Sequence, residues 1–259
     1  MSDLRRMLIC LTIVLCAQFS GAQQASSARQ MLRVAAAADL QPVLPPLLTE
    51  FENQTGIHAE ASYQSSATLA TQIINGAPFD LFLAADLSFP QRVIAAGLAE
   101  EAEPIAYARG TLVLWAHNDG RFRSLSIDSL KDPTLKSVAI ANPEHAPYGR
   151  AAQAALQRLG LYDALKPKLV IAENIAQAAQ YVESGNAELG LLSLTSAVTP
   201  RLRASGRYVL VPQDAYPPIL QGAVILKRSG GTQAHRFLDF IASAPVQEQL
   251  KAAGLAPAK

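Results

Sequence analysis

The sequence contains very little cysteine. Its 259 residues include only Cys10 and Cys16, and both lie within the first 22 residues, which we predict to be removed. The remaining chain would have no thiol, which excludes disulfides, thiolate metal sites and a cysteine nucleophile. Long apolar runs are also missing beyond that segment, since no later stretch reaches the roughly 18 uninterrupted apolar residues that a membrane span needs.

Residues 1–22 are predicted to form a signal peptide. Two arginines precede an apolar run, and the segment ends in Ser-Gly-Ala, the small residues that a signal peptidase requires. We therefore expect the mature protein to be exported and soluble. A lipid anchor on Cys16 is disfavoured, because Leu15 stands where a lipoprotein signal has a small residue.

An excess of charge of either sign is absent. The signal peptide carries two arginines and one aspartate, so its removal takes the formal net charge from +1 to zero. Binding to nucleic acid or to an anionic membrane surface relies on clustered positive charge, and we expect neither partner. Nothing in the sequence calls for a second copy of the chain, and a monomer is expected.

Familiar catalytic motifs are absent as well. The chain has no G-x-S-x-G elbow, P-loop, H-E-x-x-H or G-x-G-x-x-G pattern, and its four histidines are scattered singly. No cofactor is indicated, and we predict that the protein is not an enzyme. A hydrolase that uses Ser66 or His145 stays open as an alternative, which a screen for turnover would detect.

Strand and helix signals alternate along the mature chain, which predicts an α/β fold with largely parallel sheets. Pro45 and Pro46 predict irregular first turns in the first helix, and Gly56 its end. The predicted strands are 32–38, 57–63, 79–85, 106–116, 137–144, 168–174, 188–194, 207–212 and 217–228. The predicted helices are 40–55, 67–75, 89–97, 150–159, 175–184, 232–242 and 245–253.

Two of the predicted strands, 106–116 and 217–228, are unusually long and bracket a middle block. Strands in these places indicate that the chain leaves one lobe and later returns to it. We predict lobe I from residues 31–108 and 216–259, and lobe II from residues 109–215. A cleft between two such lobes is the usual place for a ligand.

Four loops that follow predicted strands end in small or polar residues where a helix should start: AAAADL, QSSATL, PEHAPYGR and AENIAQ. Open α/β sheets bind ligands outside the carboxyl ends of their strands. The first N–H groups of a helix lack intrahelical partners, so converging helix starts form an anion site without Arg or Lys. Asp39, Ser66 and Asn174 could each be an ordinary N-cap, but four such loops on both lobes favour the anion site.

Several long motifs span the mature chain. They include VAAAADL, GAP-x-DLF-x-x-AD, PEH-x-P-x-G-x-x-A-x-x-AL-x-x-LG and AENIAQAAQYVESGNAELGLLS. On these motifs the sequence resembles the periplasmic molybdate-binding proteins of ABC transporters. The resemblance implies a two-lobed periplasmic binding protein of type II, with a mostly parallel sheet flanked by helices in each lobe. It further implies that the lobes close on molybdate or tungstate, held by neutral N–H and hydroxyl donors, and that a permease receives the ion.

The resemblance transfers two ligand-binding residues directly: Ser66, through its hydroxyl and N–H, and Ile175, through its N–H. Three positions depart from the family pattern, with Asp39 at a usual serine, Tyr148 at a small residue and Ser193 at a usual tyrosine. We predict all five as oxyanion ligands, or as metal-binding residues if molybdate is counted as a metal. Tyr148 is hypothesised to supply the hydroxyl that position 193 lacks.

Asp39 is the most serious departure. An ionised carboxylate about 4 Å from a dianion would cost on the order of several kcal/mol at an effective dielectric near 20. The favoured interpretation is that Asp39 turns away to cap its own helix, which predicts tighter oxyanion binding in an Asp39→Ser variant. It could instead be protonated and donate a hydrogen bond. It could also, together with Ser193, signal a different ligand, namely another small oxyanion or an organic acid.

Overall fold

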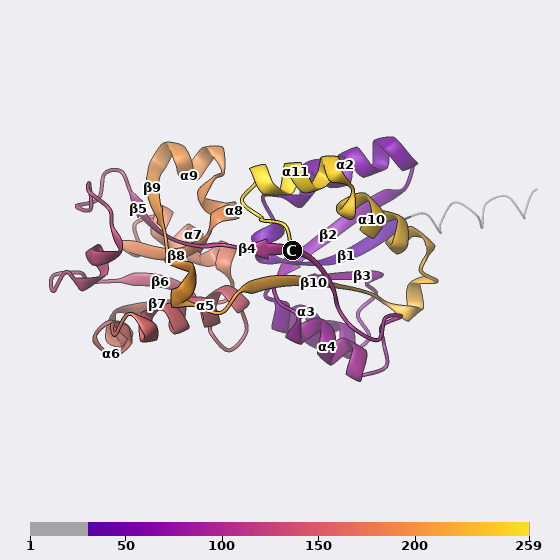
Figure 1. Cartoon of the computed structure of the whole chain (residues 1–259), viewed down its shortest axis with the longest axis horizontal. Helices are drawn as coiled ribbons and strands as arrows, with labels where there is room; N and C mark the ends of the chain where they lie inside the picture. The colour runs from indigo at the N-terminus through magenta and orange to yellow at the C-terminus, as the bar shows by residue number, and fades with distance from the viewer. Residues whose placement is uncertain (1–30, 259) are drawn as a thin grey trace, which may run out of the picture. The chain divides into compact units, whose positions relative to one another are not determined.

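Two five-stranded sheets organise residues 31–258, the part of the chain that the computed structural model describes (Figure 1). The predicted signal peptide, with both cysteines, lies outside the described residues. The first sheet has the order β2-β1-β3-β10-β4 and, with its helices, is called lobe I. The second sheet has the order β7-β6-β8-β5-β9 and is called lobe II.

Lobe I combines the first half of the mature chain with its C-terminal part. Its strands are β1 (Met31–Ala37), β2 (His58–Gln64), β3 (Leu81–Ala84), β4 (Ile105–Gly110) and β10 (Ile219–Ile225). Its helices are η2 (Ala38–Leu40), α2 (Leu44–Thr55), α3 (Ser66–Ile74), α4 (Ser88–Ala95), η6 (Lys227–Ser229), α10 (Thr232–Ala242) and α11 (Ala244–Ala252).

Lobe I has a hydrophobic core on each face of its sheet, because successive side chains of the central strands point to opposite faces. Leu83 points to one face, where the rings of Phe51 in α2 and Phe237 in α10 meet at a centroid distance of 4.9 Å. Phe82 points to the other face, and it packs with apolar side chains of α3 and α4. Successive side chains of a strand face opposite sides, so a sheet covered on both faces needs continuous apolar strands.

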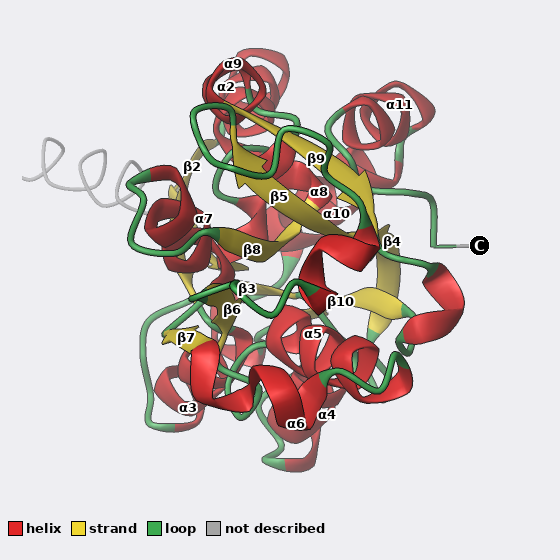
Figure 2. Cartoon of the chain, turned by 90° about the vertical axis from the view of Figure 1, so that its left-hand side faces the viewer, coloured by secondary structure: helices red, strands yellow, loops and turns green. Residues whose placement is uncertain are grey.

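Lobe II contains the middle block of the chain. Its strands are β5 (Leu112–His117), β6 (Val138–Ala141), β7 (Leu169–Ala172), β8 (Leu189–Ser193) and β9 (Gly206–Leu210). Figure 2 shows α5 and α7 on either side of β6 and β8, as right-handed crossovers in opposite directions require. The helices are η3 (Ile127–Lys131), α5 (Pro147–Arg158), α6 (Tyr162–Leu165), η4 (Lys166–Lys168), α7 (Ile175–Glu183), α8 (Leu194–Ala197), α9 (Pro200–Ser205) and η5 (Gln213–Ala215).

Both sheets are mostly parallel, as predicted, and each contains one antiparallel strand, β10 in lobe I and β5 in lobe II. The pairs β1/β3, β6/β7 and β6/β8 are parallel, whereas β10 and β5 run antiparallel to both of their neighbours. β5 and β10 are the strands with which the chain enters lobe II and re-enters lobe I. A strand that arrives from the other lobe has no βαβ crossover to set its direction parallel to its neighbours.

The predicted strand 106–116 is two strands. β4 ends at Gly110 in lobe I, and β5 starts at Leu112 in lobe II, so Thr111 alone separates the two sheets. The strand predicted at 217–228 is shorter in the structure. It is β10, and it pairs with β3 and β4 of lobe I.

The helix predicted at 150–159 begins at Pro147, since a proline fits the first turn, where its missing N–H costs nothing. The proline pair also lies in the first turn of α2, which starts at Leu44 after a separate turn. Within residues 31–258, none of the helices is long and apolar enough to cross a membrane.

Candidate functional site

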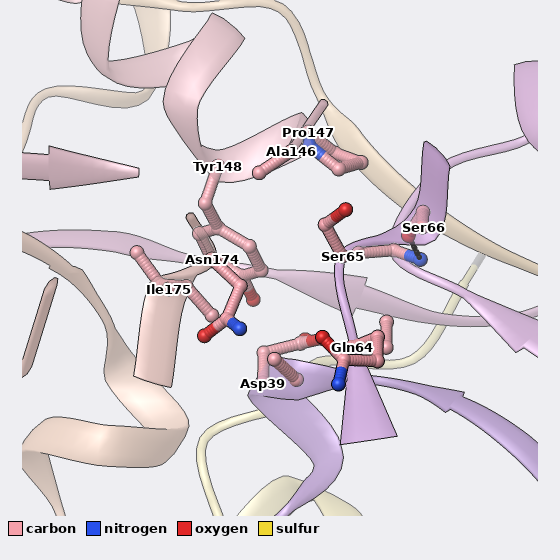
Figure 3. A pocket seen from close by; sticks show the side chains of 12 residues that line it. Asp39, Gln64, Ser65, Ser66, Ala146, Pro147, Tyr148, Asn174 and Ile175 are labelled. Carbon is pink, nitrogen blue, oxygen red and sulfur yellow. Dashed lines mark hydrogen bonds between the residues drawn. The ribbon is translucent and has the colours of Figure 1, made fainter. Parts of the chain in front are cut away.

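A small cavity lies where four of the predicted loops meet, between lobe I and lobe II (Figure 3). Its volume is about 10 Å³, room for about one water molecule. The lining comes from η2 and the start of α3 on one side and from the starts of α5 and α7 on the other. The lining residues are Ala37, Ala38, Asp39, Gln64, Ser65, Ser66, Ala85, Ala146, Pro147, Tyr148, Asn174 and Ile175.

The start of α3 presents two buried hydroxyl groups. Ser65 is the N-cap, and its Oγ accepts the N–H of Thr68 over 3.2 Å. Ser66, the first helical residue, is 1% exposed, and its Oγ accepts the N–H of Ala85 over 3.0 Å. That bond uses a lone pair of Ser66 and leaves the hydroxyl proton free to be donated, as the prediction for Ser66 requires. Among the described residues, no hydrogen bond joins Ser66 to the His145 ring.

The start of α5 contributes Tyr148. Ala146, its N-cap residue, provides no side-chain cap, and Pro147 has no N–H. The Tyr148 ring is buried, and its hydroxyl has no hydrogen-bond partner among residues 31–258. Burial first, and the Asp39 charge second, raise the pKa of Tyr148 well above its usual range, so the hydroxyl keeps its proton and remains a donor. A Cβ at Gly110 would collide with this hydroxyl, so the close packing needs glycine there.

The cap at the start of α7 leaves the N–H of Ile175 without a partner in the cap. Oδ1 of Asn174 accepts the N–H groups of Ala176 and Gln177, at 3.1 and 3.0 Å. The N-cap interpretation is therefore right for Asn174. Since the cap does not take the N–H of Ile175, that group is available at the cavity, where the prediction placed it.

Asp39 faces the cavity and does not cap its own helix, so the favoured interpretation of this residue is wrong. The N-cap of η2 is Ala37, with no side-chain cap, and Nε2 of Gln221 donates to Oδ2 of Asp39. Burial raises the pKa of the Asp39 carboxyl to about 6, although the Gln221 amide and the nearby Tyr148 hydroxyl oppose the shift. The hydroxyl lies close enough to act on the carboxyl but completes no well-formed hydrogen bond with it. The carboxyl turns toward the cavity because a polar partner in β10 holds it there.

Ser193 does not line the cavity. It ends β8 and is the N-cap of α8, where its Oγ accepts the N–H of Ser196 over 3.3 Å and the hydroxyl of Thr195 over 2.9 Å. These bonds within the first turn of α8 occupy the Ser193 side chain. Of the five residues predicted as ligands, the structure therefore brings four together and leaves Ser193 aside.

Direct contacts between the lobes surround the cavity. The N–H of Ala67, in the first turn of α3, donates to the carbonyl oxygen of His145 in lobe II over 3.2 Å. Arg150 of α5 forms an ion pair with Asp86 of lobe I, and its guanidinium lies over the ring of Phe89, 5.1 Å from the centroid. These contacts hold the closed arrangement through protein atoms.

The cavity is neutral or acidic in character. None of the described residues that line it is Lys, Arg or His, and Asp39 is the only carboxylic acid among them. Residues 31–258 also contain no group of three His, Cys, Asp or Glu side chains that could hold a metal cation. The arrangement can therefore bind an anion through N–H and O–H donors. The helices α3, α5 and α7 also direct the positive ends of their dipoles to the anion.

The sequence prediction missed several residues of this region. Ser65 stands beside the predicted Ser66, and helix-cap chemistry could have identified it. Gln221 is the one polar side chain in β10, and its partner Tyr107 lies in β4. The only sequence feature that marks Gln221 is its polar side chain within an apolar run, and this feature does not indicate which residue it contacts.

Comparison with known proteins relates the chain to binding proteins. The family model described as "Bacterial extracellular solute-binding protein" matches residues 32–256. Molybdate-binding protein ModA of Azotobacter vinelandii is 38% identical over 224 residues, which cover 86% of this chain and 88% of that protein. Molybdate-binding protein ModA of Escherichia coli (strain K12) is 29% identical over 242 residues, which cover 91% of this chain and 93% of that protein.

Solved structures show the same fold. The Azotobacter vinelandii periplasmic molybdate-binding protein superposes with a TM-score of 0.81 and 32% identity, covering 87% of this chain and 98% of that one. The sulfate-binding protein SubI from Mycobacterium tuberculosis H37Rv has a TM-score of 0.74 at 16% identity, covers 88% of this chain and 87% of its own, and supports the fold alone. The predicted two-lobed periplasmic binding protein fold is confirmed, and the relatives are solute-binding proteins and not enzymes.

Proposed function

The chain belongs to the family of bacterial extracellular solute-binding proteins, and on this premise we propose that it is the substrate-binding component of an ABC importer for molybdate or tungstate. One observation carries the proposal. The starts of α3, α5 and α7, from both lobes, line a small cavity that offers neutral donors and no cationic side chain. Oxyanions bind well at such helix starts.

Four residues are proposed as oxyanion ligands. Ser66 donates its hydroxyl and N–H, Ile175 its N–H, Tyr148 its hydroxyl, and Asp39 a backbone N–H or a carboxyl proton. Ser193 supports the site from outside by capping α8. A cavity this small suits a compact ion better than an organic acid with a carbon skeleton.

The proposal also includes a cellular location and a protein partner. The mature protein is exported to the periplasm after loss of residues 1–22, binds as a monomer, and presents its closed lobes to a membrane permease. The lobes are taken as residues 31–108 with 216–259, and 109–215. The solved relative from Azotobacter vinelandii is named a periplasmic protein, which supports the location.

Isothermal titration of the ligand-free mature protein with molybdate, then with tungstate, tests the function. We expect binding that excess sulfate weakens little, because a closed ring of donors leaves some of them unpaired around an ion of the wrong radius. The titration is repeated with excess sulfate and with excess phosphate at two pH values. Absence of heat with both molybdate and tungstate would reject the proposal.

Tyr148→Phe is expected to weaken molybdate binding about tenfold, the usual effect of losing one hydrogen bond to a charged group. The ring keeps its packing against Gly110, so the fold should be unchanged. The titration is compared with Tyr216→Phe, which removes another buried hydroxyl, one that accepts the Leu112 N–H, away from the cavity. Full affinity in Tyr148→Phe would show that this hydroxyl is not a ligand.

A second candidate ligand is a protonated oxyanion such as hydrogen phosphate. The observation in its favour is Oδ1 of Asp39, which is buried and has no hydrogen-bond partner among the described residues. A site made only of donors rejects a protonated oxygen, whereas an ionised Asp39 could accept its proton. Phosphate that competes well at pH 8, where Asp39 is ionised, but poorly at pH 5 would identify this ligand class.

A further inference from the structure

A buried polar chain lies behind the cavity, on β4 and β10. The hydroxyl of Tyr107 in β4 donates to Oε1 of Gln221 in β10 over 2.6 Å, and Nε2 of Gln221 donates to Oδ2 of Asp39. Gln221 and Asp39 are fully buried, and Tyr107 is nearly so. Polar groups at this depth are costly unless they are hydrogen-bonded, so each member restrains the orientation of the next.

The Tyr107 hydroxyl determines which way the Gln221 amide faces. Burial and the Asp39 charge raise the pKa of Tyr107 well above its usual range, so its O–H group remains a donor. A donor selects the amide oxygen and turns the amide nitrogen to Asp39. Gln221 also stands at a register shift between β10 and β4, the kind of irregularity that re-aims a side chain.

The other oxygen of Asp39 is left for the cavity. Oδ1 is buried and has no hydrogen-bond partner in residues 31–258, and the same holds for the Tyr148 hydroxyl. Figure 3 shows Asp39 and Tyr148 on opposite sides of the cavity, directed to the same space. Two such atoms lose the free energy of their hydrogen bonds unless a ligand bonds to them or the Tyr148 hydroxyl, which lies near the carboxyl, moves to donate to Asp39.

We propose that Gln221, held by Tyr107, is a positioning residue of the site: it binds Oδ2 of Asp39 and thereby presents Oδ1 to the ligand. This inference rests on the proposed function, since the ligand is taken to be the oxyanion. When Asp39 carries a proton, the amide donor at Oδ2 places that proton on Oδ1, where it makes one more hydrogen bond to the ion. The groups that face the carboxyl are the neutral side chains of Gln221 and Tyr148, with Tyr107 behind them.

A double-mutant cycle with molybdate as the probe tests the coupling. At pH 5, where Asp39 is mostly protonated, Gln221→Leu is expected to weaken binding about tenfold in the native background, the effect of misplacing one charge-assisted hydrogen bond. In an Asp39→Ser background, whose short side chain Gln221 does not hold, the same change should alter affinity less than about twofold. Equal losses in both backgrounds would show a merely structural role and overturn the proposal.

Tyr107→Phe is the conservative variant, because it removes the group that orients the amide and keeps the ring. We expect a smaller loss, about three- to fivefold, with nothing comparable in the control Tyr216→Phe. A Tyr107→Phe variant that behaves like the control would remove Tyr107 from the proposal.

A ligand-free measurement separates this inference from the proposed function. Titration of the Asp39 carboxyl carbon by NMR should show a higher pKa in Gln221→Leu, because the Gln221 hydrogen bond lowers the pKa of Asp39, and an unchanged pKa in Tyr216→Phe. An unchanged pKa in Gln221→Leu would overturn the positioning role. Should the native protein bind neither molybdate nor tungstate, the proposed function fails, and this titration still decides whether Gln221 holds the carboxyl.

Discussion

At pH 8 the Asp39→Asn variant is expected to bind molybdate about 100-fold more tightly than the native protein, and at pH 5 about equally well. The pKa of Asp39 is raised to about 6 by burial. An ionised Asp39 about 4 Å from the ion would cost about 4 kcal/mol for each pair of unit charges at a dielectric of 20. Protonating it costs only about 1.4 kcal/mol per pH unit above the pKa, so the native protein binds the ion together with a proton.

The change of molybdate affinity with pH tests whether the ion binds together with a proton. Above about pH 6 the affinity of the native protein should fall tenfold per unit, whereas that of Asp39→Asn should stay level. Isothermal titration in buffers of different ionisation enthalpy should show uptake of about one proton at pH 8 and almost none at pH 5. Asp163→Asn, on the surface of α6, is the matched control and should follow the native curve. A native affinity that does not change between pH 5 and pH 8 would contradict the prediction.

Asp39→Asn should also stabilise the ligand-free protein at neutral pH, by about 3 kcal/mol. Burial raises the pKa of Asp39 from 3.8 to about 6, so the folded state holds its proton more tightly than the unfolded chain does. A carboxyl with a raised pKa contributes its full stability below about pH 4 and loses it as the pH rises through 6. The amide of asparagine imitates the protonated acid and does not titrate.

Chemical denaturation between pH 3.5 and 8 measures this difference. The free energies of unfolding of the native protein and of Asp39→Asn should converge near pH 3.5 and separate as the pH rises to 7. Asp132→Asn is a control of opposite sign, because hydrogen bonds from Thr134 lower the pKa of Asp132 and its stabilising effect is lost as the pH falls. Curves for the native protein and Asp39→Asn that stay parallel across this range would show that Asp39 is not buried as a titrating acid.

The order of strands and helices was predictable because the turns between them require characteristic residues. Gly56, for example, ends α2 with a positive φ of 70°, a conformation that glycine adopts without strain. The break at Thr111 left no such mark. Residues 106–116 are mostly apolar and rich in β-forming residues, and periodicity does not reveal that a chain changes sheets in the middle of such a run.

The candidate site was predictable to the extent that it follows from helix starts. Ser66, Tyr148 and Ile175 each lie in the first turn of a helix that follows a strand, and parallel strands bring such turns to one edge. Ser193 also follows a strand, but a short helix uses its hydroxyl. Gln221 could not be placed, since it lies 182 residues from Asp39 and meets it only through the register of β10 in the sheet.

The contacts between the lobes have a consequence for transport. The hydrogen bond from Ala67 to His145 and the ion pair between Arg150 and Asp86 involve no ligand atom, so they favour the closed form whether or not an ion is bound. By population shift, some empty molecules are then closed and compete with loaded ones at the permease. Uptake in a cell that overproduces this protein should therefore pass through a maximum and decline, as empty molecules occupy the permease without delivering cargo.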